Sequence, residues 1–213
     1  MPHGVSIWGG GGTATVVNLS EDTVYVLANK PWTYKAIGKV KFDAVVKKNS
    51  GTISGGGCFA AGTKIMVAPN VYKNIEDIIV NDSIISYNVL FNSYEQSKVL
   101  TCNTYDNKQV YEIILDNNKK LYTSDCHPFL GADNVWYAID TDMALSQHQV
   151  IANKLSPGTI IKQYNNTAIV QAINKTNRIE TLYDIGVSNI SHTYIANDCI
   201  VHNIMEFVHF DKS

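Results

Sequence analysis

The run Cys58-Phe59-Ala60-Ala61-Gly62-Thr63-Lys64-Ile65 begins directly after three glycines, and the run Ile200-Val201-His202-Asn203 lies near the far end of the chain. A cysteine can attack the carbonyl group of the preceding residue and turn that peptide bond into a thioester. An asparagine side chain can attack its own backbone carbonyl, which closes a succinimide and releases the downstream segment. Both reactions are intramolecular, so a fold promotes them by holding the reacting groups in attack geometry. The two runs therefore predict a chain that cuts its own peptide bonds.

The size and charge of the chain leave room for one domain, or one domain with a small appendage. It has 213 residues, of which 45% are hydrophobic, and 17 basic residues stand against 19 acidic ones for a net charge of −2. No basic stripe favours nucleic acid as a partner. The apolar stretches are too short to span a membrane, and the first residues do not resemble a secretion signal. We therefore expect no nucleic-acid or membrane partner, and a cytoplasmic protein.

The four cysteines do not predict a metal or a disulfide framework. They are Cys58, Cys102, Cys126 and Cys199, and no two have the spacing of a zinc ribbon. A chain without a secretion signal is expected to keep its thiols reduced. We expect no cofactor and no metal.

Residues 1–57 differ in composition from the rest. Predicted strands at 13–17, 23–27 and 39–46 indicate a small antiparallel sheet, and the Gly- and Ser-rich stretch 49–57 has the composition of a linker. The chain is therefore divided into a β-rich N-terminal segment (1–57), a central domain (58–203) and a short C-terminal peptide (204–213).

The central domain is predicted to be all-β, because short runs of β-forming residues alternate with Asn, Asp and Gly. Only 74–79 and 142–147 have the pattern of short helices. The predicted strands are 63–67, 83–87, 110–115, 120–122, 136–139, 150–152, 159–163, 168–173, 179–185, 193–196 and 199–201.

Three motifs in this domain resemble those of the Hint domain, the self-processing module shared by inteins and Hedgehog proteins. They are the opening run at Cys58, the run Thr123-Ser124-Asp125-Cys126-His127-Pro128-Phe129, and the closing region from Leu182-Tyr183-Asp184-Ile185 to His202-Asn203. The resemblance is to a bacterial intein-like domain, or to a mini-intein without an endonuclease and without the downstream nucleophile. It implies a compact, horseshoe-like fold of many short strands over residues 58–203.

The resemblance assigns the first reaction to Cys58, with help from the middle motif. His127 matches the histidine that hydrogen-bonds the nitrogen of the scissile amide and protonates it as it leaves. The family usually has Thr three residues before this histidine, and this chain has Ser124 there; Thr123 is the alternative. Asp184 matches the closing-motif Asp, which is placed to take the thiol proton or to stabilise the geometry in which the thioester forms.

The resemblance assigns the second reaction to Asn203. His192, eleven residues earlier, is expected to polarise the amide, and His202 to hydrogen-bond the carbonyl group that Asn203 attacks. His3, His148 and His209 fall outside the motifs and receive no role.

Two departures from the family change the expected products. Splicing inteins have Cys, Ser or Thr after the terminal Asn, whereas this chain has Ile204, which carries no nucleophile. We expect cleavage at Gly57–Cys58 by water, an external thiol or an external amine, and cleavage at Asn203–Ile204, with splicing as at most a minor outcome. The second departure is Asp198-Cys199, where the family often has Gly and an aliphatic residue; it is expected to slow the closing step.

Two alternatives remain open on the sequence alone. In one, the chain is a structural or particle-associated protein of a phage or mobile element, with a slow or inactive Hint domain, so a phage-like particle is a second expected location. In the other, the chain is a Hedgehog-like transferase that uses cholesterol. This alternative fits the sequence poorly, because such a protein would not need His202-Asn203 and would want a lipid-recruiting extension. We also consider a Cys58–Cys126 disulfide that locks the domain, against the simpler hypothesis that Cys126 is a buried filler.

Overall fold

The computed structural model describes residues 4–9, 12–20, 23–27, 35–36 and 58–203. The chain divides into two units, Met1–Gly51 and Thr52–Ser213. The predicted strand at 39–46, the linker at 49–57 and the C-terminal peptide lie outside the described residues.

The N-terminal unit contains an antiparallel sheet in the order β1-β2-β3-β4. Its strands are β1 (Gly4–Gly9), β2 (Gly12–Ser20), β3 (Thr23–Leu27) and β4 (Lys35–Ala36). The strands predicted at 13–17 and 23–27 fall within β2 and β3.

Residues 58–203 form an extended, almost entirely antiparallel sheet of thirteen strands. Two of these strands are long, β9 (Ser93–Leu115) and β15 (Asn166–Val187). The others are β5 (Phe59–Ala60), β6 (Lys64–Ala68), β7 (Val71–Asn74), β8 (Ser83–Asn88), β10 (Lys120–Thr123), β11 (Phe129–Leu130), β12 (Trp136–Ala138), β13 (Asn153–Lys154), β14 (Ile160–Gln163), β16 (Thr193–Ala196) and β17 (Cys199–His202). The prediction of an all-β fold is confirmed.

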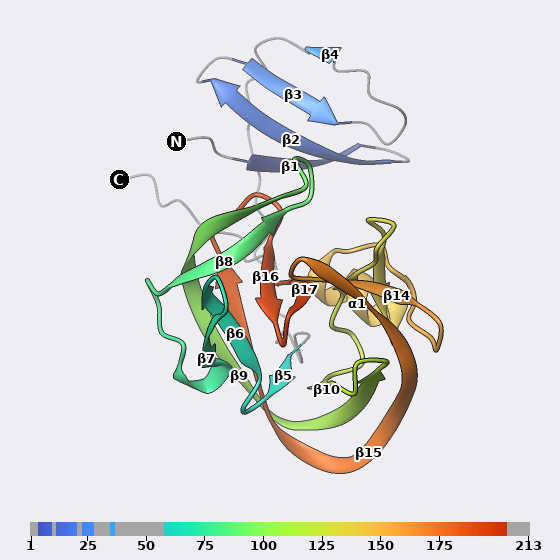
Figure 1. Cartoon of the computed structure of the whole chain (residues 1–213). Coiled ribbons are helices and arrows are strands. Elements are labelled where there is room, and N and C mark those ends of the chain that lie inside the picture. Colours follow the sequence, from blue (N-terminus) through green and yellow to red (C-terminus); the bar gives the residue numbers. More distant parts are fainter. Residues whose placement is uncertain (1–3, 10–11, 21–22, 28–34, 37–57, 204–213) are drawn as a thin grey trace. The chain divides into compact units, whose positions relative to one another are not determined.

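The two long strands pair with each other and bend together, as the green and orange ribbons of Figure 1 show. Their register shifts four times, for instance between Lys175 and Ile179, and such irregularities let a paired ribbon curve. The sequence predicted short strands throughout this region, at 110–115, 168–173 and 179–185. That part of the prediction was wrong, because the polar stretch 103–109 pairs with 179–184, and β15 continues through 174–178 across a register shift rather than breaking into a loop.

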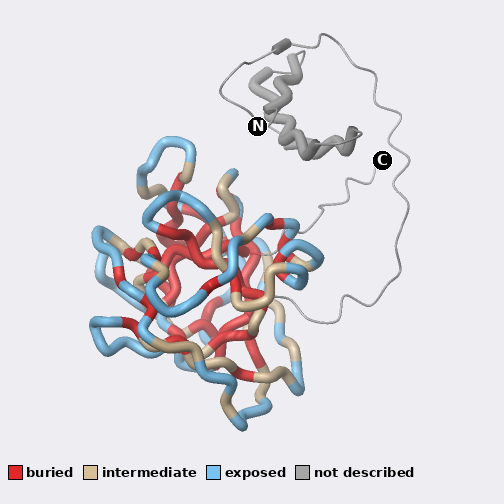
Figure 2. Tube along the Cα trace, turned by 90° about the vertical axis from the view of Figure 1, so that its right-hand side faces the viewer, coloured by how far each residue is buried: buried red, intermediate tan, exposed pale blue. Residues whose placement is uncertain are grey.

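The core fills the space that the bent sheet encloses. Its largest cluster includes Phe59, Ile113, Leu115, Leu121 and Tyr194, all fully buried. Figure 2 shows buried segments in the interior and exposed loops around them. The residues that carry the three motifs therefore lie in the packed part of the molecule.

One α-helix occurs in the described residues, α1 (Thr141–His148). The Asp140 side chain accepts a hydrogen bond from the Met143 N–H at 2.9 Å, which caps its first turn, and Gln149 ends it in the left-handed conformation. The predicted helix at 142–147 is thus confirmed with one further residue at each end. The stretch predicted as a second helix contains only the 3-10 turn η1 (Ile75–Asp77).

The strand predicted at 150–152 was wrong. Its residues follow the left-handed cap at Gln149, and pairing begins only at β13, which runs parallel to β12. No helix of the described ranges has the length and apolar character to cross a bilayer.

Two leucines on β9 test the position of the core. Leu115 is 0% exposed and belongs to the main cluster, whereas Leu100 is 47% exposed. Leu115→Ala should lower the free energy of unfolding by about 2–5 kcal/mol, because it leaves a cavity. Leu100→Ala should change it by less than about 1 kcal/mol. Urea denaturation measures both, and equal effects would contradict this arrangement of the core.

Candidate functional site

The backbone of Cys58 is held by the two hydroxyl residues of the middle motif. The N–H of Cys58, which is the nitrogen of the Gly57–Cys58 peptide bond, donates to Ser124 Oγ at 3.0 Å. The carbonyl oxygen of Cys58 accepts from the Thr123 hydroxyl and from the Ser124 N–H, each at 2.9 Å. Ser124 thus contacts the nitrogen of the Gly57–Cys58 peptide bond, and Thr123 contacts the carbonyl oxygen of Cys58.

The Cys58 thiol lies in a closed, anionic environment. Its residue is 0% exposed, and burial raises the pKa of the thiol well above its ordinary value, with the charge of Asp184 raising it further. Asp184 is itself buried on β15, where its Oδ1 accepts from the Tyr194 hydroxyl at 3.3 Å. The thiol is therefore protonated at neutral pH, and its attack on a carbonyl carbon requires a base.

His127 packs beside the residue that follows the thiol. Its buried ring lies 4.2 Å from the ring of Phe59 and 6.1 Å from the ring of Tyr194, measured between centroids. Pro128, the next residue, disfavours a helical backbone at His127. The imidazole is therefore fixed near Cys58 by aromatic packing.

The Asn203 end is held by a strand hairpin, and two imidazoles lie beside it. In β16 and β17, Thr193 pairs with His202, and the N–H of Asn203 donates to the carbonyl oxygen of His192 at 2.8 Å. The His192 and His202 rings lie 5.9 Å apart, and Asn203 is only 2% exposed. Burial lowers the pKa of both histidines, so both are neutral at neutral pH.

The segment from Thr123 to Phe129 joins the two ends. Thr123 pairs with Phe59 of β5, and Phe129 pairs with Val201 of β17. Between them, the carbonyl oxygen of Pro128 accepts from the His202 N–H at 3.1 Å. The opening and closing motifs are thus strand neighbours of one seven-residue stretch.

Strand β15 brings the two ends together a second time. Tyr183 pairs with Phe59, and three residues later a Cβ placed on Gly186 would lie 3.8 Å from the Asn203 amide nitrogen. The predicted site residues therefore gather in one largely buried region: Cys58, Ser124, His127, Asp184, His192, His202 and Asn203.

One residue of this region was missed by the sequence analysis. His148 ends α1 and is 0% exposed; its ring lies 5.4 Å from that of His127 and 6.3 Å from that of His202. It belongs to no motif. No sequence signal pointed to it, because the burial of His148 and of Ala144, four residues earlier, is seen only in the structure.

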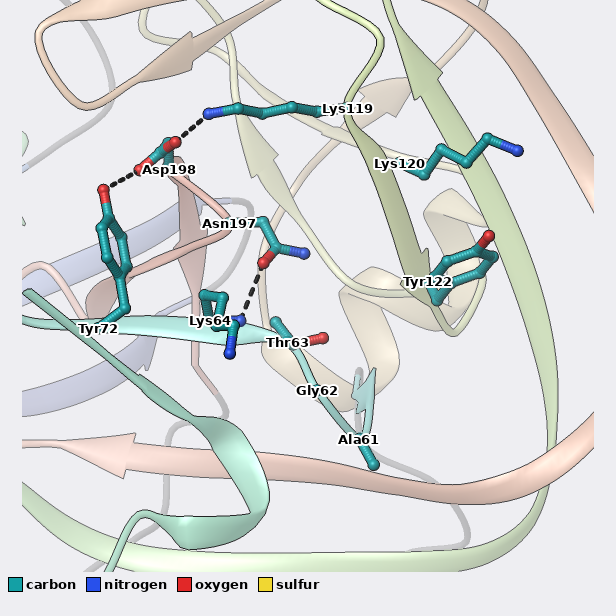
Figure 3. Close-up of a pocket in the computed structure, with 10 residues that line it drawn as sticks. All are labelled: Ala61, Gly62, Thr63, Lys64, Tyr72, Lys119, Lys120, Tyr122, Asn197 and Asp198. Carbon is teal, nitrogen blue, oxygen red and sulfur yellow. Dashed lines mark hydrogen bonds and ion pairs between the residues drawn. The ribbon is translucent and has the colours of Figure 1, made fainter. Parts of the chain in front are cut away.

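The departure at Asp198 has a local explanation. Asn197 and Asp198 form the two-residue turn between β16 and β17, with positive φ values of 45° and 67°, which Asn and Asp tolerate. The Asp198 carboxylate accepts from the Tyr72 hydroxyl and forms an ion pair with Lys119, as Figure 3 shows. The turn is therefore fixed although it contains no glycine.

The residues that make these contacts help to line a pocket of about 560 Å³. It lies at the opposite end of the β16–β17 hairpin from His202, and none of the predicted site residues lines it. Its lining residues are Ala61, Gly62, Thr63, Lys64, Tyr72, Lys119, Lys120, Tyr122, Asn197 and Asp198.

Cys126 lies near the site as a free, buried thiol. It donates to Gln147 Oε1 at 3.1 Å and lies 3.6 Å from Ser124 Oγ. Within residues 58–203 and the described strands of the N-terminal unit, no three His, Cys, Asp or Glu side chains are grouped as metal ligands.

Comparison with solved structures identifies the architecture. A DnaB intein from Synechocystis superimposes with a TM-score of 0.58 at 22% identity, over 70% of this chain and 99% of that one. A bacterial intein-like domain from Clostridium thermocellum gives 0.55 at 23% identity, over 68% and 98%. The gp41-1 intein gives 0.54 at 23% identity, over 70% and 100%.

No protein-family model matches the sequence, and no curated protein matches it. The likeness therefore lies in the fold, and it spans almost the full length of each solved domain. The central domain of this chain has the intein-like Hint fold.

Proposed function

We propose that residues 58–203 are an intein-like self-processing domain that cuts the chain on both sides of itself. It forms a thioester at Gly57–Cys58 and cleaves Asn203–Ile204 by cyclisation of Asn203. The flanking segments are its substrate. The observation that carries the proposal is that the 123–129 segment pairs with β5 at one end and with β17 at the other.

The first step moves the acyl group of Gly57 from nitrogen to sulfur. The Cys58 sulfur attacks the Gly57 carbonyl carbon, the C–N bond breaks, and the nitrogen leaves as an amine that takes up a proton. The Ser124 hydroxyl on that nitrogen and the nearby His127 imidazole support protonation of the leaving group. Asp184, the anionic neighbour of the thiol, is the base in this proposal.

The second step cleaves the last peptide bond of the domain. The Asn203 amide nitrogen attacks the Asn203 carbonyl carbon, a succinimide closes, and the Ile204 nitrogen leaves with a proton. The buried, neutral His202 is suited to donate a hydrogen bond to the carbonyl oxygen as negative charge develops there.

The residue after Asn203 determines the products. Ile204 offers no hydroxyl or thiol to receive the acyl group, so the thioester is consumed by water, an external thiol or an external amine. Joining of the two flanks then requires attack by the freed Ile204 amine and remains a minor product.

Single substitutions should separate the two cuts. Cys58→Ala should abolish cleavage at Gly57–Cys58 and spare cleavage at Asn203–Ile204. Asn203→Gln should do the reverse, because the longer side chain does not close the five-membered ring. Time-resolved intact mass with added thiol should show fragments that end at residues 57 and 203.

Cys102→Ala is the matched control, since Cys102 is a free thiol on β9 that the proposal does not use. It should cut like the parent chain. A parent chain that stays full-length through long incubation with thiol would contradict the proposal and favour a silent module in a larger assembly.

The role of Asp184 can be tested by pH. Asp184→Asn should slow the first cut, because the protonated thiol loses its base. The residual rate should then rise about tenfold per pH unit below the thiol pKa, since only the thiolate fraction reacts. The parent should show a shallower rise over the same range. Equal slopes for the two chains in thiol-induced cleavage assays would exclude Asp184 as the base.

A further inference from the structure

His148 is a buried imidazole that neither of the two proposed steps uses. His148 occupies the last position of α1. Asp140 caps the start of this helix and Gln149 ends it in the left-handed conformation, so the backbone of His148 is fixed. Ala144, four residues earlier, is the other buried residue of the helix. The inner face of α1 therefore presents an imidazole to the interior of the domain.

The surroundings of His148 keep this imidazole neutral. Burial, together with the neighbouring His127, lowers its pKa to about 3. A neutral imidazole has one N–H donor and one acceptor nitrogen, and a buried N–H is costly without an acceptor. His148 is thus suited to donate a single hydrogen bond without adding charge to the site.

The backbone of Asn203 is a hydrogen-bond partner of His148. This contact raises the pKa of His148 against the effect of burial, as expected where an imidazole N–H donates to a carbonyl oxygen. The Asn203 N–H already donates to the His192 carbonyl at 2.8 Å, which leaves the Asn203 carbonyl as the acceptor. The backbone of Asn203 also raises the pKa of His202 against the effect of burial.

We propose that His148 is a second hydrogen-bond donor to the Asn203 carbonyl and that, with His202, it forms the oxyanion hole for succinimide closure. The inference rests on the proposed function. Attack by the Asn203 amide nitrogen moves the carbonyl electron pair onto oxygen, between the two N–H donors. Collapse of this intermediate re-forms the carbonyl and breaks the bond to the Ile204 nitrogen, which takes the proton that the attacking amide gives up.

Two donors from different elements fit the demands of this step. His202 arrives on β17 and His148 on α1, and their rings lie 6.3 Å apart at an interplanar angle of 80°. The donors are held in place before the reaction by strand pairing and by the helix cap. Loss of one such preorganised donor typically slows a reaction by about 10²–10³-fold.

The cleavage test uses the whole chain with Cys58→Ala, which isolates the second cut. His148→Phe keeps an aromatic ring but removes the donor, and should slow cleavage at Asn203–Ile204 by about 10²-fold or more. His148→Gln keeps an N–H donor and should retain most of the rate. Leu145→Phe, at an exposed position of the same helix, should cut like its parent. Equal rates for His148→Phe and its parent would overturn the proposal.

A second readout does not require cleavage. The sequence contains no Gln-Ile dipeptide, so Asn203→Gln creates a unique one with Ile204. Labelling glutamine with ¹³C at the carbonyl carbon and isoleucine with ¹⁵N then gives one NMR signal that reports the carbonyl at position 203. His148→Phe, added to Cys58→Ala and Asn203→Gln, should move that carbon upfield, as should His202→Phe. Chemical-shift dispersion of the remaining amide signals shows whether each variant is folded.

The two readouts distinguish failure of the proposed His148 contact from failure of the proposed function. An unchanged carbonyl signal in folded His148→Phe would overturn the contact and with it the role of His148, whether or not the chain cuts itself. A shifted signal in a chain whose Cys58→Ala parent never cuts would overturn the proposed function, and with it the catalytic role of His148. A shifted signal together with the slowed cut supports both.

Discussion

The site depends on the double strand pairing of residues 123–129. Thr123 pairs with β5 and Phe129 with β17, so two segments more than 130 residues apart are placed against one short stretch. The hydrogen bonds between Ser124 and Cys58, and between His202 and Pro128, fix Cys58 and His202 at its two ends. In the proposed self-cutting reaction this arrangement replaces substrate binding, because folding supplies the proximity of the reacting groups.

Burial determines the charge state of the reacting groups. It raises the pKa of the Cys58 thiol and lowers those of His148, His192 and His202, so the thiol and these imidazoles are neutral near pH 7. A neutral thiol is a poor nucleophile, whereas a neutral imidazole is still a hydrogen-bond donor. In the proposed mechanism, the same buried interior makes the first step dependent on a base and leaves the second step to hydrogen bonding.

Much of the fold could be predicted from the sequence, and the same physical reasons explain which elements and residues were missed. The strand at 193–196 was predicted to the residue, because its apolar residues lie between clear turn signals. The full lengths of β9 and β15 were not predicted, because each polar middle part is kept in the strand by pairing of the two long strands, and local composition does not reveal a distant partner. The motif residues were found by their order and spacing. His148 was not, because its importance arises only when the end of α1 packs beside His127 and His202, which no spacing along the chain encodes.

The cluster of buried imidazoles has a consequence for acidic surroundings. An unfolded chain protonates its histidines near the ordinary pKa of 6.5, while the folded chain resists protonation of His148 down to about 3. Between these values the unfolded state binds more protons, so the fold loses stability as the pH falls, at up to about 1.4 kcal/mol per unit for a single group. His192 and His202, with pKa values lowered in the same direction, add to the loss. The residues that would catalyse scission thus also make the domain acid-labile.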